Sequence, residues 1–197
     1  EGMAEANYLY KNTSIYFNEH IANEDLEEFA IHECIHHLQE IKTGRNKLLR
    51  MGLCSFNALS PVGMGINEAA VQLATSKMIG IQPDFVKYYG IELKSSSPSY
   101  YPMECHLVDQ MAFITGYNVL FESTFYSNDN FKNTFIKALV MTLAVVFVVS
   151  CFFAGGDGSV AVAESFIKLI DKNIDTGLFN YLDDSVVFKL PSTVKDT

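Results

Sequence analysis

The feature that most constrains the fold of this chain is an uninterrupted apolar run near its C-terminal end. Nineteen consecutive residues, from Ala138 to Gly156, carry no charged side chain, and their valines, leucines and phenylalanines leave no polar helical face. A helix of this length can cross a bilayer, whereas a small soluble domain would have to enclose it on all sides. The run therefore predicts a membrane-spanning helix, with a fully buried core helix as the alternative.

The same run divides the chain into three parts. We expect a folded domain over residues 1–137, the membrane or core helix over 138–156, and a tail of unknown role over 157–197. Lys132 and Lys137 precede the run, so the positive-inside rule predicts a membrane-associated protein whose first domain is cytoplasmic. If the run is a core helix instead, we expect a soluble cytoplasmic protein.

Acidic residues outnumber basic ones. Among 197 residues, 14 Lys and Arg stand against 23 Asp and Glu, which gives a net charge of −9. Because such a chain repels phosphates, nucleic acid is excluded as an expected partner. Apolar residues make up 49% of the sequence, enough to bury a core. The four cysteines form no CxxC pair, and we expect them to be reduced.

Turn and cap signals predict a mostly helical domain with a small N-terminal antiparallel sheet. Aromatic and β-branched residues on either side of a polar interruption predict a hairpin over residues 7–17. Three helices are expected, over residues 24–42 with a stop at Gly44, over 66–79, and over 102–121. Glycines, prolines and serines predict a loop over 55–65. The expected fold class is therefore α+β.

The most informative motif, HExxH, lies inside the first predicted helix. His32 and His36 are four residues apart, so both project from one face and can bind one Zn²⁺ through a ring nitrogen. Glu33 stands beside the open coordination position, where it can take a proton from bound water. Another side of this helix is expected to face the core, with Ile31, Cys34, Ile35, Leu38 and Ile41.

A catalytic zinc site needs a third protein ligand. Glu68 is the best choice, because it opens a helix of small and apolar residues, where an inward carboxylate requires a cation. The alternative is an acid stabilised by the helix dipole. Gln72, one turn further on, is expected to orient a bound imidazole. His106 is the candidate donor to the tetrahedral intermediate, with a purely structural role as its alternative.

These motifs resemble those of the gluzincin metallopeptidases, which carry HExxH on one helix and a glutamate ligand, often after Asn, on the next. The matching positions are His32, Glu33, His36, Asn67 and Glu68. The run His-Glu-x-x-His-His-Leu-Gln followed by Asn-Glu-Ala-Ala-Val-Gln is also similar to a group of small, uncharacterised bacterial zinc-peptidase-like proteins. The resemblance implies a zincin-like domain with a strand-edged cleft, zinc as cofactor, and hydrolysis of a peptide or protein substrate.

The sequence thus predicts a zinc metallopeptidase with Glu33 as general base. The strand around residues 15–17 is the expected edge on which an extended substrate would pair. Two alternatives stay open, namely a non-catalytic, zinc-stabilised, membrane-associated interaction protein and a zinc hydrolase that acts on something other than peptides. Glu33 argues against the first, because a purely structural site has no use for a base beside an open position.

Overall fold

A computed structural model describes residues 5–56 and 60–154 of the chain. The described residues fall into two units, unit 1 up to Phe131 and unit 2 from Lys132 onwards, and each is considered by itself. The tail over 157–197 and the last two residues of the apolar run lie outside the described residues. Helices and antiparallel strands occur together, so the predicted α+β class is confirmed.

The elements of the described chain alternate between short strands and helices. Its strands are β1 (Ala6–Leu9), β2 (Ser14–Phe17), β3 (Glu40–Lys42), β4 (Leu48–Met51), β5 (Cys54–Phe56), β6 (Pro61–Val62), β7 (Asp84–Tyr88) and β8 (Ile91–Ser95). Its helices are α1 (Leu26–Leu38), α2 (Met64–Ile79), α3 (Pro102–Thr115), α4 (Tyr117–Tyr126) and α5 (Asn130–Ala154).

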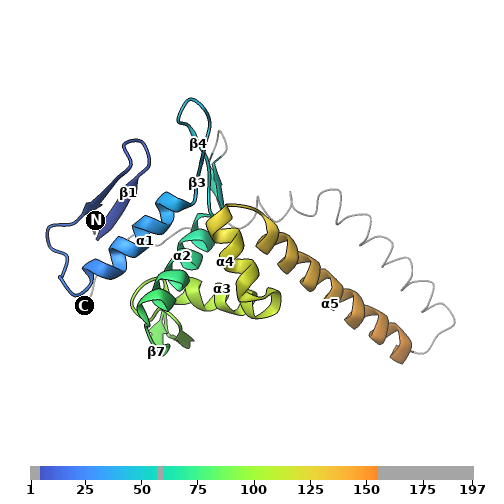
Figure 1. The fold of residues 1–197 in the computed structure, drawn as a ribbon. Coiled ribbons are helices and arrows are strands. Elements are labelled where there is room, and N and C mark those ends of the chain that lie inside the picture. Colours follow the sequence, from blue (N-terminus) through green and yellow to red (C-terminus); the bar gives the residue numbers. More distant parts are fainter. Residues whose placement is uncertain (1–4, 57–59, 155–197) are drawn as a thin grey trace. The chain divides into compact units, whose positions relative to one another are not determined.

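The predicted N-terminal hairpin is confirmed. β1 pairs antiparallel with β2, with Ala6 opposite Phe17, and the pair lies along α1 (Figure 1). The amide of Asn18 donates to the carbonyl of Glu5, so these two residues form a hydrogen-bonded pair. Hydrogen-bonded and non-hydrogen-bonded pairs alternate along an antiparallel ladder, which makes Tyr8 and Ile15 a non-hydrogen-bonded pair. The backbone groups of Tyr8 consequently point away from β2.

The first helix ends earlier than predicted. α1 stops at Leu38, and β3 begins two residues later and pairs with β4. The carbonyl of Gln39 accepts a hydrogen bond from the Ser127 hydroxyl instead of continuing the helix. The predicted stop at Gly44 is therefore wrong, because Gly44 lies in the turn between β3 and β4.

Two groups of strands were not predicted. β3, β4, β5 and β6 form one antiparallel sheet in that order, and part of it occupies the expected loop over 55–65. Strands of two to four residues are too short to show the alternation that marks a strand in a sequence. β7 and β8 form a further hairpin, whose two turn residues, Tyr89 and Gly90, both have positive φ angles (48° and 82°).

The helix predicted over 66–79 is confirmed as α2, which starts two residues earlier and ends at Gly80 with a φ of 78°. The helix predicted over 102–121 is interrupted. Gly116 has φ 99° and ψ 133°, which no helix accommodates, and it separates α3 from α4.

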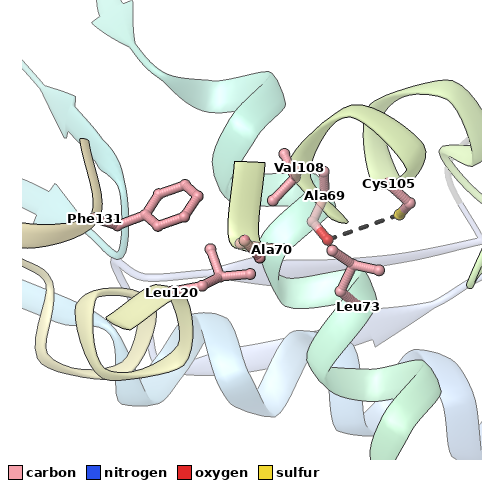
Figure 2. Packing of buried hydrophobic residues seen from close by; sticks show 8 residues of the cluster. Ala69, Ala70, Leu73, Cys105, Val108, Leu120 and Phe131 are labelled. Carbon is pink, nitrogen blue, oxygen red and sulfur yellow. Dashed lines mark hydrogen bonds between the residues drawn. The ribbon is translucent and has the colours of Figure 1, made fainter. Parts of the chain in front are cut away.

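The core of unit 1 is built around α2. The small side chains of Ala69 and Ala70 let α3 and α4 approach closely, and Cys105 of α3 donates a weak hydrogen bond to the carbonyl of Ala69 (Figure 2). Leu120 of α4 and Phe131 complete the cluster. α2 therefore packs against both α3 and α4 in this cluster.

The predicted core stripe on α1 is mostly wrong. Ile35 is 2% exposed, but Leu38 is 67% exposed, and Cys34 and Ile41 are also exposed. The buried side chains of α1 are instead Glu28, His32, Glu33, Ile35 and His36. The helix therefore turns the residues of its motif, together with Ile35, toward the rest of unit 1.

In unit 2, α5 carries most of the predicted apolar run. Among the side chains of α5 whose burial the structure describes, six large apolar ones are exposed, namely Leu139, Met141, Leu143, Val145, Val146 and Val149. The stretch Asn130–Phe147 is long and apolar enough to cross a membrane by length and composition, a criterion that core helices of soluble proteins also meet.

Candidate metal centre

Three predicted ligands converge between α1 and α2. The Nε2 atoms of His32 and His36 lie 3.1 Å apart, and Oε2 of Glu68 lies 3.2 Å from the first and 3.3 Å from the second. Both imidazoles are buried, with 5% and 4% exposure. Within the described residues, these three form the group of side chains that could hold a metal ion.

The spacing of these atoms fits a small tetrahedral cation. Zinc bonds of about 2.0–2.1 Å in tetrahedral geometry hold neighbouring ligand atoms roughly 3.3 Å apart. Two imidazole nitrogens and one carboxylate oxygen are a donor set of catalytic zinc sites, which keep the fourth position open. The centre is therefore suited to a divalent metal ion with one free coordination position.

The charges at the centre depend on one another. Burial alone would raise the pKa of Glu68, but hydrogen bonds from the two imidazoles and their positive charge lower it to about 2. Burial disfavours the imidazolium form of His36, yet the hydrogen bond and charge of Glu68 raise its pKa above the usual value. In the absence of a metal, a proton on His36 compensates the buried carboxylate of Glu68.

The Nδ1 atom of each imidazole contacts the side-chain oxygen of a glutamine. Nδ1 of His32 lies 2.9 Å from Oε1 of Gln72, the contact expected from the sequence. Nδ1 of His36 lies 3.2 Å from Oε1 of Gln39, which the sequence did not single out. Because both Nδ1 atoms are occupied, each ring presents Nε2 to the centre.

Glu33 lies on the inner face of α1, as HExxH spacing requires. Burial raises the pKa of its carboxyl above the usual value, and the nearby imidazoles only partly offset this. Its carboxylate accepts a hydrogen bond from the backbone amide of Tyr8. The strand whose backbone reaches Glu33 is therefore β1.

The side chain of Tyr8 fixes β1 on the end of α1. Its hydroxyl donates to Oε1 of Glu40 at 2.8 Å and lies 2.8 Å from Nδ1 of His37. Burial and the carboxylate of Glu40 raise the pKa of Tyr8 to about 12, so the hydroxyl stays protonated. β1 is thus attached to α1 through both its backbone and a side chain.

Tyr101 is a residue of the centre that sequence reasoning missed. Its ring stacks near His32, with 6.4 Å between the ring centroids and 19° between their planes. Burial, and then the charges of Glu68 and Glu33, raise the pKa of its hydroxyl far above the usual value. Tyr101 also has a φ of 50° directly before Pro102, a conformation that disfavours both a large side chain and a following proline.

His106 is placed elsewhere. Its Nδ1 donates to the carbonyl of Lys94 at 2.8 Å, and its Nε2 lies 3.0 Å from Nε2 of Gln110. It lines a cavity of about 400 Å³ together with other residues such as Asp109 and Tyr117, none of which belongs to the metal centre. Its predicted role as a donor at the centre gains no support from these contacts.

Comparison of the chain with protein families, with curated proteins and with solved structures finds no significant match. Any conclusion about function therefore rests on the residues of the centre and their geometry.

Proposed function

We propose that the protein is a zinc-dependent peptidase of the gluzincin type. The observation that carries this proposal is the position of Glu33, a buried carboxyl of raised pKa, on the buried face of α1 that also carries His32 and His36, whose Nε2 atoms converge with Oε2 of Glu68. A structural metal site would close the fourth position with another protein ligand and would need no base beside it. The added base supports hydrolysis.

The residues of the centre would have separate roles in hydrolysis. When bound, zinc supplies Lewis acidity and lowers the pKa of a coordinated water toward neutrality. His32, His36 and Glu68 would hold the ion. Glu33 would accept a proton from the attacking water and return it to the leaving amine, and its raised pKa brings it closer to the operating pH that favours such transfers.

Tyr101 is the residue that we place opposite Glu33 as a hydrogen-bond donor. Its raised pKa keeps the hydroxyl protonated, so that it can donate to an oxygen that gains negative charge during the reaction. Its strained backbone is consistent with a position that is held for function. The role predicted for His106 can be tested beside it, with Tyr101→Phe and His106→Ala compared in one assay.

Strand β1 offers the peptide-binding edge of this proposal. The backbone groups of Tyr8 face away from β2, and the Tyr8 amide lies on the Glu33 carboxylate. A substrate that added a strand at this edge would bring its backbone past the proposed base. An extended peptide is therefore the substrate class that we favour.

We further propose that α5 anchors the protein in a membrane, with the catalytic unit on the cytoplasmic side. The exposed apolar side chains of α5 support insertion, and Lys132 and Lys137 at its beginning support the cytoplasmic orientation.

The deciding experiment compares the full chain with its Glu33→Gln variant. Zinc content is measured in both proteins, and both are incubated with a peptide library. We expect equal zinc content and a loss of cleavage of at least about 10²- to 10⁴-fold in the variant. If the wild type carries zinc and cleaves no peptide, or if both cleave equally, the peptidase proposal fails. The zinc-stabilised interaction protein then becomes the better account.

A further inference from the structure

We propose that Gln72 and Gln39 fix the tautomers of the two metal-binding histidines, and that each amide is held in orientation by its other hydrogen-bond partners. This inference rests on the metal-binding part of the proposed function and not on peptide hydrolysis. It assigns positioning roles to Glu28, Ser97, Asn67 and Gln39, which the HExxH pattern does not contain.

The orientation of the Gln72 amide behind His32 depends on Ser97. The Ser97 hydroxyl donates its single proton to the carbonyl of Tyr100 at 2.8 Å, so it can only accept from Nε2 of Gln72, 3.0 Å away. The same Nε2 donates to Oε1 of Glu28 at 2.5 Å. The Gln72 amide therefore has its NH₂ group on this side, and its oxygen faces Nδ1 of His32.

An amide oxygen only accepts hydrogen bonds, so Nδ1 of His32 must carry the proton. The Nε2 atom of the neutral ring then carries the lone pair, and this is the atom that points at Glu68 and His36. The tautomer of His32 that a metal requires is thus determined by Ser97 and Glu28, which act through Gln72.

The orientation of the Gln39 amide behind His36 depends on a backbone amide. The N–H of Leu53 donates to Oδ1 of Asn67 at 2.9 Å, which fixes the orientation of the Asn67 side chain. Nδ2 of Asn67 consequently faces Gln39 and donates to its Oε1 at 3.3 Å. That same oxygen lies 3.2 Å from Nδ1 of His36, which must again be the donor.

The surroundings of Gln39 show which end of its amide matters. Its side chain is 1% exposed, yet its Nε2 makes no hydrogen bond within the described chain, so the orientation is set at the oxygen. Gly52, with a φ of 56°, makes room for this arrangement. A Cβ atom there would lie 2.0 Å from Oδ1 of Asn67 and 2.4 Å from Nε2 of Gln39.

Two substitutions at Gln39 separate acceptor chemistry from shape. Gln39→Met keeps the length of the side chain but removes the acceptor, and it should weaken zinc binding about 10- to 100-fold. Gln39→Glu keeps an acceptor at the same place, and because Nε2 has no partner, the change removes no hydrogen bond. This variant should bind zinc at least as tightly as the wild type. Affinity is measured on the full chain by competition with a chelator, and circular dichroism checks that each variant is folded.

Asn67→Asp gives the sharpest test, because two explanations predict opposite changes in zinc affinity. A negative charge added near a cation should tighten zinc binding if only electrostatics matters. In our scheme the new oxygen faces Oε1 of Gln39, the amide turns its NH₂ toward it, and Nδ1 of His36 becomes an acceptor. The proton then moves to Nε2, where it competes with the metal, and at mildly alkaline pH binding should weaken by about 10-fold or more.

A spectroscopic measurement on the wild type keeps the inference falsifiable even if a variant misfolds. NMR of the zinc-loaded full chain should show both ligating rings with a proton on Nδ1 and the metal on Nε2. Coordination through Nδ1, unchanged affinity in folded Gln39→Met, or tighter binding in folded Asn67→Asp would overturn it. A wild type that binds no zinc would overturn this inference and the proposed function together, whereas zinc binding without peptide cleavage affects the proposed function alone.

Discussion

Helices α1 and α5 present their side chains in opposite ways. α1 buries two histidines and two glutamates while Leu38 is 67% exposed, and α5 leaves a series of leucines and valines exposed. The difference lies in the partners that each helix finds. Each buried polar residue of the α1 motif has hydrogen-bonding or charged neighbours on α2 or β1, so burial costs it little. Burial therefore follows available partners more closely than it follows hydropathy.

The largest expected effect concerns the buried polar residues that α1 places at the metal centre. Glu68→Ala removes the carboxylate that contacts two buried imidazoles and supplies the third ligand. Zinc affinity should fall by well over the roughly 10- to 100-fold that loss of an orienting partner costs. Chelator competition measures this, with Glu104→Ala as a control of the same charge change. Wild-type affinity in the Glu68 variant would remove Glu68 from the centre.

The second-largest expected effect concerns the exposed apolar side chains of α5. If α5 lies in a bilayer, Leu143→Lys places a charge within the span and should disfavour insertion by about 2.5–3.5 kcal/mol. Flotation of the full chain with vesicles measures the membrane-bound fraction, and Leu143→Phe serves as the matched control. A wild-type chain that stays in solution without detergent would contradict a membrane role for α5.

A third effect concerns acid and the metal-free protein. Because the pKa of Glu68 is lowered from 4.5 to about 2 in the folded state, its ionised form stabilises the fold above the unfolded-state value. This contribution, on the order of 3 kcal/mol, should be lost as the pH falls from about 4.5 to about 2. Denaturant unfolding of wild type and Glu68→Gln across this range measures it. Parallel pH profiles for the two proteins would show that Glu68 does not carry the effect.

The smallest effect compares two apolar positions on α1 itself. Leu38→Ser, on the exposed face, should change the free energy of unfolding by no more than about 0.5 kcal/mol. Ile35→Val, which deletes one buried methylene, should cost about 1 kcal/mol. Urea unfolding of both variants gives the values. A larger loss at Leu38 would mean that a partner covers this face.

The local parts of the centre could be predicted from the sequence. The i, i+4 spacing of His32 and His36 determines their shared face within one helix, and Glu68 is conspicuous as an acid in an otherwise apolar helix. The N-terminal hairpin and the end of α2 at Gly80 likewise depend on neighbours in sequence.

What could not be predicted depends on contacts between distant residues. α1 ends at Leu38 because the following chain pairs with β4, and its inner face is chosen by partners on α2 and β1. Tyr101 reaches His32 from a loop about seventy positions further along the chain, and no local pattern marks it. The direction in which His106 points depends equally on a carbonyl of β8.

The hydrogen bond between the Tyr8 amide and Glu33 gives the molecule an internal reporter. Tyr8 belongs to a two-stranded hairpin and faces away from its partner strand, so its amide would ordinarily exchange with solvent deuterium quickly. The carboxylate of Glu33 protects this amide while it accepts its proton. Exchange at one residue of β1 therefore follows the state of a side chain on α1, and an event that draws Glu33 away becomes visible there without any change in fold.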